Sequence, residues 1–70
     1  MANNLANARL HAGFSQTEMA NALGVTQAAV AAWENGTNKP RYSMLAKIAQ
    51  VLGCSVSDVI LSLDSADEPA

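Results

Sequence analysis

The side chains that could do catalytic chemistry are few, and they do not form a recognisable set. The chain has one histidine, His11, and one cysteine, Cys54. His11 has no cysteine or carboxylate partner at a metal-ligand spacing, and Cys54 stands at a small hydrophobic position typical of a core residue. There are no paired carboxylates, no nucleophile beside a base and no glycine-rich loop that would hold a phosphate. We therefore expect neither an enzyme nor a bound metal or other cofactor.

The side chains that remain are ones that could bind a partner, and most of them lie in or next to one stretch of the sequence. Residues 26–36 read TQAAVAAWENG, with one glutamine and several alanines at positions that a helix would turn outward. Lys39 and Arg41 follow directly, and they are half of the four basic residues in the chain. Side-chain amides bind partners through hydrogen bonds, and lysine and arginine bind them through hydrogen bonds and charge. The kind of partner therefore depends on how the helices and loops present these side chains.

Length and composition indicate one small helical domain. Seventy residues form one domain at most, and folding at this size buries only about 60% of the surface that the unfolded chain exposes. Alanine is abundant and the aromatic residues are Phe14, Trp33 and Tyr42, which favours closely packed helices over a sheet. A single cysteine excludes an internal disulfide, and no apolar run suits a signal peptide or a membrane span. We expect a cytoplasmic protein without a membrane partner.

The net charge of −2 has the wrong sign for a simple nucleic-acid binder, but it is unevenly distributed. Three of the six acidic residues, Asp64, Asp67 and Glu68, fall in the last nine positions. The preceding part has four basic and three acidic residues, a net charge of +1. The expected domain is therefore weakly charged rather than basic.

Turn and cap signals divide the chain into five short helices, which predicts an all-α fold. Two capping boxes, SQTE at residues 15–18 and SVSD at residues 55–58, open the second and fifth helices. Thr26 caps the third, and glycines end the first four. The expected helices run from residue 3 or 4 to 12, 16–23, 27–35, about 41–52, and 56 to about 61. Residues 1–61 would form the domain, and residues 62–70 an acidic, disordered tail.

The second and third of these helices have the pattern of a helix-turn-helix. Ala20 is small enough for one helix to cross the other closely, and Gly24 suits the tight turn between them. Met19, Val25, Val30 and Trp33 would form the wedge that sets the angle. The other expected core positions are Leu23, Ala29, Leu45, Ile48, Ala49, Leu52, Val56, Val59 and Ile60. This geometry lets the helix at residues 27–35 enter a DNA major groove while its neighbour crosses the backbone.

The stretch GFSQTEMANALGVTQAAVAAWENGTNKPRYSMLAKIAQVLGCSVSDVI resembles the Cro/CI-type, or XRE-type, helix-turn-helix family. The resemblance covers residues 5–61 and includes the helix-turn-helix spacing, the WENG…KP segment and the LGCSVSDVI ending. It implies a compact five-helix, lambda-repressor-like domain. It also implies an ion pair between Arg9 and Glu34, with two unrelated surface charges as the alternative.

The same resemblance assigns DNA contacts residue by residue. Gln16 would bind a phosphate at the positive end of its helix, and Gln27 would hydrogen-bond a base, for which adenine is suited. Ala28, Ala31 and Ala32 depart from the family's polar pattern; they either pack on thymine methyl groups or only maintain the helix. The remaining candidate contacts are Thr26, Asn35, Asn38, Lys39 and Arg41. The segment NGTNKPRY, which carries the last four, is alternatively an ordinary solvated loop.

The function implied is a sequence-specific regulator of transcription, a repressor that binds a near-palindromic site in double-stranded DNA as a homodimer. Leu61 and Leu63, apolar and past the expected core positions, would form the dimer interface. The implied source is a bacterium or a phage. The alternative is an antitoxin or protein-interaction module on the same fold, with a regulatory protein as partner.

Overall fold

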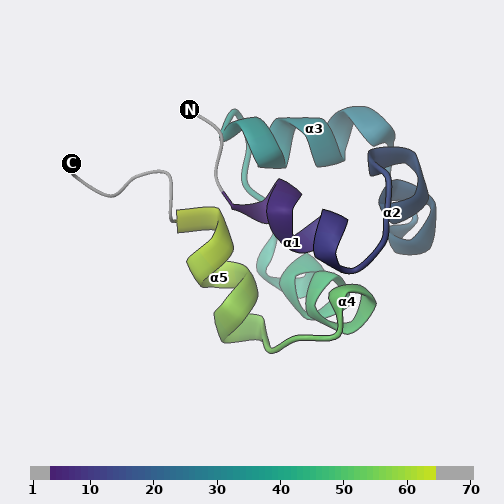
Figure 1. The fold of residues 1–70 in the computed structure, drawn as a ribbon. Coiled ribbons are helices and arrows are strands. Elements are labelled where there is room, and N and C mark those ends of the chain that lie inside the picture. Colours follow the sequence, from purple (N-terminus) through teal and green to yellow (C-terminus); the bar gives the residue numbers. More distant parts are fainter. Residues whose placement is uncertain (1–3, 65–70) are drawn as a thin grey trace.

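The computed structural model describes residues 4–64, and within that range the chain forms five α-helices and no strand (Figure 1). In chain order they are α1 (Leu5–His11), α2 (Gln16–Leu23), α3 (Gln27–Asn35), α4 (Tyr42–Leu52) and α5 (Val56–Asp64). α2 packs on α3 and α4, while α5 packs on α4 and α1. α1 also contacts α3 and so lies between α3 and α5 (Figure 1). The predicted all-α, lambda-repressor-like fold is confirmed.

The helix-turn-helix begins and turns where its cap residues predict. The Ser15 hydroxyl accepts from the Glu18 amide at 3.0 Å, and the Glu18 carboxylate accepts from the Ser15 amide at 2.8 Å. Hydrogen bonding to the Glu18 carboxylate, first from the Ser15 backbone amide and then from the Ser15 side chain, favours its charged form and lowers the pKa of Glu18. Between the helices, Gly24 has a φ of 74°, a left-handed conformation that side chains resist. The Thr26 hydroxyl then accepts from the Ala29 amide at 3.1 Å and starts α3.

The core lies where the five helices meet and includes the predicted wedge. Met19 and Val30 have no exposed surface, Trp33 is buried, and Val25 packs half-buried against them. Ala20, the residue predicted to lie at the crossing of α2 and α3, is only 2% exposed. The remaining buried apolar residues are Leu5, Leu23, Leu45, Ile48, Ala49 and Val59.

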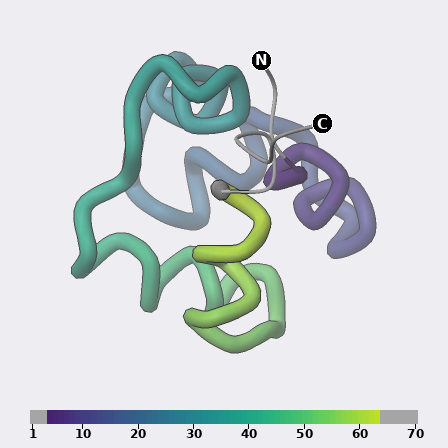
Figure 2. The backbone as a smooth tube through the Cα atoms, turned by 90° about the vertical axis from the view of Figure 1, so that its left-hand side faces the viewer, coloured from purple at the N-terminus to yellow at the C-terminus, as the bar shows by residue number. Residues whose placement is uncertain are grey.

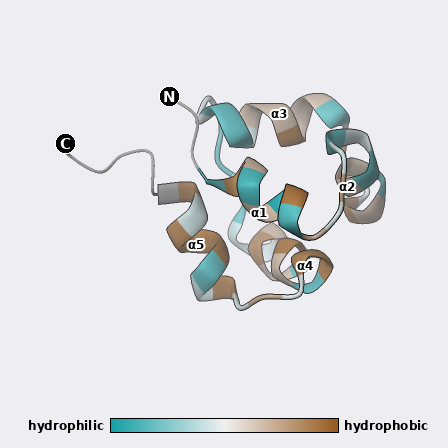
Figure 3. Ribbon diagram, in the orientation of Figure 1, coloured by the Kyte–Doolittle hydropathy of each residue, from teal (hydrophilic) through white to brown (hydrophobic). Residues whose placement is uncertain are grey.

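Hydropathy follows this packing. α4 is hydrophobic along most of its length, whereas α3 is hydrophilic at its two ends and moderately hydrophobic, tan to brown, between them (Figure 3). No single helix within residues 4–64 is long and apolar enough to cross a membrane. α4 and α5 pass that test only when taken together, and they are bent by 106° at the break between them.

Three expectations about the C-terminal part were wrong. α5 continues to Asp64, beyond the expected end near residue 61, while residues 65–70 of the expected tail lie outside the described part. Ile60 is 38% exposed because Val56, Val59 and Leu63 already form the inward stripe of α5. Cys54 is exposed because it lies in the turn after Gly53, and desolvation, with Asp58 nearby, raises the pKa of its thiol.

Candidate nucleic-acid interface

Buried residues on the inner side of α3 hold this helix against the core, so that its opposite side faces outward. Val30 and Trp33 are buried, whereas Thr26, Gln27 and Ala28 at the beginning of α3 are exposed. Ala31 and Ala32 are half-buried, so they are less exposed than the sequence predicts for an outward-facing row of alanines. On α3 the exposed residues are therefore Gln27 and Ala28 at its N-terminal end and Asn35 at its C-terminal end.

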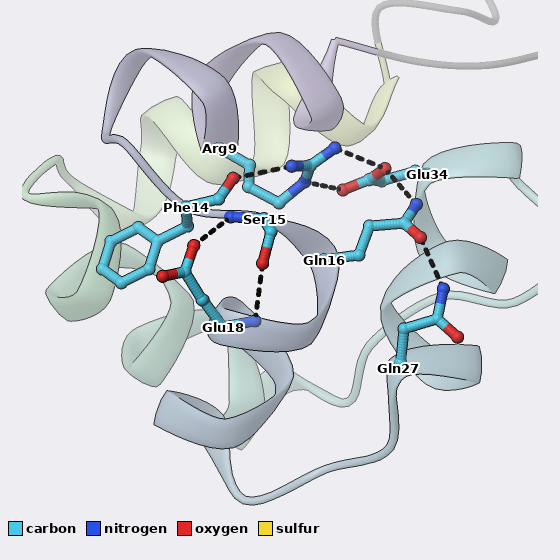
Figure 4. Close-up of polar contacts among 7 residues, drawn as sticks. All are labelled: Arg9, Phe14, Ser15, Gln16, Glu18, Gln27 and Glu34. Atoms are coloured by element: carbon cyan, nitrogen blue, oxygen red, sulfur yellow. Dashed lines mark hydrogen bonds and ion pairs between the residues drawn. The ribbon is translucent and has the colours of Figure 1, made fainter.

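A buried ion pair joins α1 to α3, as expected. Arg9 Nε donates to Glu34 Oε2 at 2.7 Å, and Arg9 Nη2 donates to Glu34 Oε1 at 3.4 Å. The two side chains are only 9% and 6% exposed. Arg9 Nη1 also donates to the Phe14 carbonyl oxygen at 2.7 Å, which ties the pair to the chain entering α2 (Figure 4). The pair therefore holds α1, the start of α2 and the end of α3 together.

Two glutamines extend this buried pair to the surface. Gln16 Nε2 donates to Glu34 Oε1 at 2.9 Å, and Gln27 Nε2 donates to Gln16 Oε1 at 2.6 Å (Figure 4). We call the series Arg9, Glu34, Gln16 and Gln27 the glutamine relay. It begins at a buried guanidinium and ends at an exposed carboxamide on the first turn of α3.

The relay has one direction because Glu34, as a carboxylate paired with arginine, can only accept hydrogen bonds. Gln16 must therefore turn its NH₂ toward Glu34, which leaves its carbonyl oxygen facing Gln27. Gln27 must in turn use one N–H on Gln16, so its carbonyl oxygen and second N–H remain for a ligand. The buried charge thus sets the orientation of an exposed hydrogen-bonding group.

The connection from α3 to α4 carries the exposed cations. This segment runs along an outer edge of the domain (Figure 2), and Asn38, Lys39 and Arg41 on it are all exposed. These three side chains line one shared cavity of about 320 Å³. Asn35, the last residue of α3, is also exposed, but it does not line this cavity.

Sequence reasoning missed the glutamine relay and part of the cavity wall. Gln16 was assigned to a phosphate, with no indication that it bonds both Glu34 and Gln27. Those partners are 18 and 11 residues away, and no local pattern predicts contacts that depend on the angle between helices. Ser43 and Met44, which complete the cavity, carried no signal at all. Between residues 4 and 64, no group of three or more histidine, cysteine or acidic side chains is placed to hold a metal ion.

The fold and the exposed start of α3 define a helix-turn-helix domain. A profile of the helix-turn-helix family matches residues 5–59. The chain belongs to this family, of the Cro/CI or XRE type, and so to the DNA-binding regulators of transcription. No curated protein matches the chain.

Solved structures share the architecture. The clp gene regulator ClgR from Corynebacterium glutamicum has a TM-score of 0.76 and 28% identity, over 86% of this chain and 77% of that one. A second ClgR structure has a TM-score of 0.78 and 27% identity, over 90% and 67%. The DNA-binding domain of the P22 C2 repressor has a TM-score of 0.76 and 21% identity, over 94% and 86%, a likeness of fold.

The Arg9–Glu34 pair should be much more sensitive to loss of one partner than to loss of both. We expect Glu34→Leu or Arg9→Met alone to lower the free energy of unfolding by about 3–5 kcal/mol, because each leaves one buried charge without its partner. The double variant should recover a large part of that loss, since apolar side chains then fill the site. Urea denaturation of the four proteins measures this coupling. If the double variant instead loses the sum of the two single losses in unfolding free energy, the two side chains are not energetically coupled and the prediction is wrong.

Proposed function

We propose that this chain is a sequence-specific repressor of transcription that inserts the N-terminal end of α3 into the DNA major groove. The observation that carries the proposal is the glutamine relay, which holds Gln27 exposed and in one orientation. Membership of the helix-turn-helix family supports it, as does the likeness to ClgR, which is a regulator of clp genes.

The free groups of Gln27 match one base edge. Its carbonyl oxygen can accept from the N6 amino group of adenine while its second N–H donates to adenine N7. Reversing the amide would break the hydrogen bond to Gln16, so the relay favours the orientation that keeps both of these groups available for adenine. Gln27 is therefore the proposed source of direct base recognition.

The rest of the interface supplies position rather than base recognition. Thr26 and Gln16 lie beside Gln27. At the other end, Asn35 is the last residue of α3, and the segment that follows carries three further exposed residues that can hold the sugar-phosphate backbone, Asn38, Lys39 and Arg41. Ala28 cannot hydrogen-bond, but its methyl group can pack on a thymine methyl, and Ala31 and Ala32 add little exposed surface. With so few base contacts, the shape and deformability of the operator would contribute to specificity.

The salt dependence of binding tests whether DNA is the ligand. A dimer that uses Lys39 and Arg41 in each copy neutralises four phosphates, so log K against log salt should have a slope of about −3.6. Arg41→Gln should reduce the magnitude by about 1.8, because one phosphate contact is lost in each copy. Lys47→Gln, a matched change at an exposed position on α4, should leave the slope unchanged. A flat slope for the unaltered protein would exclude this binding mode.

Gln27→Ala should change specificity more than general affinity. We expect a loss of about 1–3 kcal/mol on the selected operator and little loss on random duplex, since the base contact goes and the backbone contacts stay. Discrimination at one adenine position per half-site should disappear. Gln50→Ala removes an exposed glutamine from α4 and serves as the control. The measurement is selection from a random duplex pool followed by titration. An unchanged base preference for Gln27→Ala would refute the assigned role.

We also propose that the protein binds DNA as a homodimer through α5. Leu61 is 67% exposed and Ile60 is 38% exposed on this helix. Leu63, expected to lie past the core, is instead half-buried against it, because α5 extends further than predicted. Beside Ile60 and Leu63, a small groove of about 120 Å³ is lined by Pro40 and Leu45. This apolar surface adjoins the segment that carries Lys39, so a dimer made here would place two such segments near one DNA duplex.

Leu61→Glu should weaken binding to a two-half-site duplex at least tenfold and leave binding to a single half-site unchanged. A carboxylate in the proposed interface would have to be buried unpaired or repelled by its symmetry mate. Leu10→Glu is the matched control, because Leu10 is similarly exposed at 61% but lies on α1. Equal affinity of Leu61→Glu and the unaltered protein for the two-half-site duplex would exclude this interface.

A further inference from the structure

The cavity beside the helix-turn-helix is lined by apolar side chains that a contact with the DNA backbone would not require. It lies between α3 and the first turn of α4 and has a volume of about 320 Å³, within the range of small-molecule sites. Its exposed rim carries Lys39 and Arg41, which the proposed function uses for phosphates. Its wall includes Trp33 and Met44, which a phosphate on the surface would not touch. The apolar part of the cavity is therefore unexplained by DNA binding.

Three elements contribute this apolar wall. Val25 comes from the turn between α2 and α3, Trp33 from α3 and Met44 from α4. Trp33 is 7% exposed, and Val25 and Met44 are half-buried, so all three are held in place by the core. An aromatic ring against a methionine sulfur and an indole makes favourable contacts. The wall thus suits a flat apolar group.

The cations on the rim favour a ligand with a negative charge. Among the described side chains, the Arg9–Glu34 pair is the ion pair present, and it involves neither Lys39 nor Arg41. Ser43 and Asn38 also line the cavity, and a hydroxyl and a carboxamide are groups that can donate hydrogen bonds. Two cations and two neutral donors around an apolar wall are complementary to a small anion with an apolar body.

We propose that this cavity binds a small aromatic carboxylate and that the bound ligand lowers the affinity for DNA. The ring lies against Trp33 and Met44, and the carboxylate lies between Lys39 and Arg41. The ligand neutralises the cations that would otherwise attract phosphates, so ligand and DNA compete. The regulatory half of the proposal rests on the proposed DNA binding, whereas ligand binding does not.

Trp33 provides a direct measurement, since it is the one tryptophan of the chain and lines the cavity. The probe is 3-phenylpropanoate, with the neutral 3-phenylpropanamide as its matched control, and no DNA is present. We expect a saturable change in Trp33 fluorescence with a Kd of roughly 1 mM, as for a fragment-sized ligand. The amide should bind at least about threefold more weakly, because it lacks the charge. No saturable change, or equal binding of acid and amide, would overturn the proposal.

Variants separate the cavity from general surface effects. Ser43→Phe should abolish the saturable change by filling the cavity from an exposed position. Lys39→Gln with Arg41→Gln should remove the preference for the acid over the amide. Lys47→Gln, outside the cavity, should behave as the unaltered protein. A fluorescence response that persists in Ser43→Phe would place the ligand elsewhere and overturn the proposal.

The coupling to DNA is tested separately. Saturating 3-phenylpropanoate should raise the Kd for the selected operator at least threefold, relative to sodium acetate at matched ionic strength. An unchanged Kd would overturn the regulatory half, even if the ligand binds. If the protein binds no DNA while the fluorescence titration succeeds, the proposed function fails and the ligand site stands.

Discussion

The arrangement depends on one buried ion pair. Arg9 and Glu34 come from α1 and α3, and their charges are almost removed from water, at 9% and 6% exposure. Removing charges from water is costly, so such a pair persists only with good geometry and further hydrogen bonds. The Phe14 carbonyl and the Gln16 amide supply these. Because both belong to the start of α2 or the chain before it, satisfying the pair also determines where α2 lies relative to α3.

The same pair determines which donor and acceptor groups are exposed at the N-terminal end of α3. A carboxylate accepts and a guanidinium donates, and neither can exchange these roles. Each glutamine amide could otherwise be turned either way, but the accepting Glu34 selects one orientation of Gln16 and then one of Gln27. A hydrogen-bonding group fixed before the ligand arrives loses less conformational entropy on binding. The structural ion pair and the proposed base contact therefore form one continuous unit.

Sequence reasoning predicted the local features and missed those that depend on several helices at once. The capping box at Ser15 and the left-handed Gly24 follow from rules within a few residues, and both are present. Cys54 was misplaced because its hydrophobic type was weighed above its position in a turn. The resemblance to the family supplied the Arg9–Glu34 pair, which joins residues 25 apart. The Gln16 hydrogen bonds and the cavity around Met44 could not be predicted, because they join segments that meet only once separate helices have packed.

The charge distribution limits what one domain can contribute to the proposed DNA binding. Of the four lysine and arginine residues, Arg9 is committed to the buried pair and Lys47 lies on α4 outside the cavity, which leaves Lys39 and Arg41 beside α3. One domain can therefore neutralise few phosphates, and Gln27 adds at most one bidentate base contact. In the proposed dimer, two copies linked through α5 would double both contributions without any new contact within the domain. Because the cations are so few, an anion that occupies Lys39 and Arg41 would remove most of the electrostatic attraction at once, so a weak ligand could have a large effect on DNA binding.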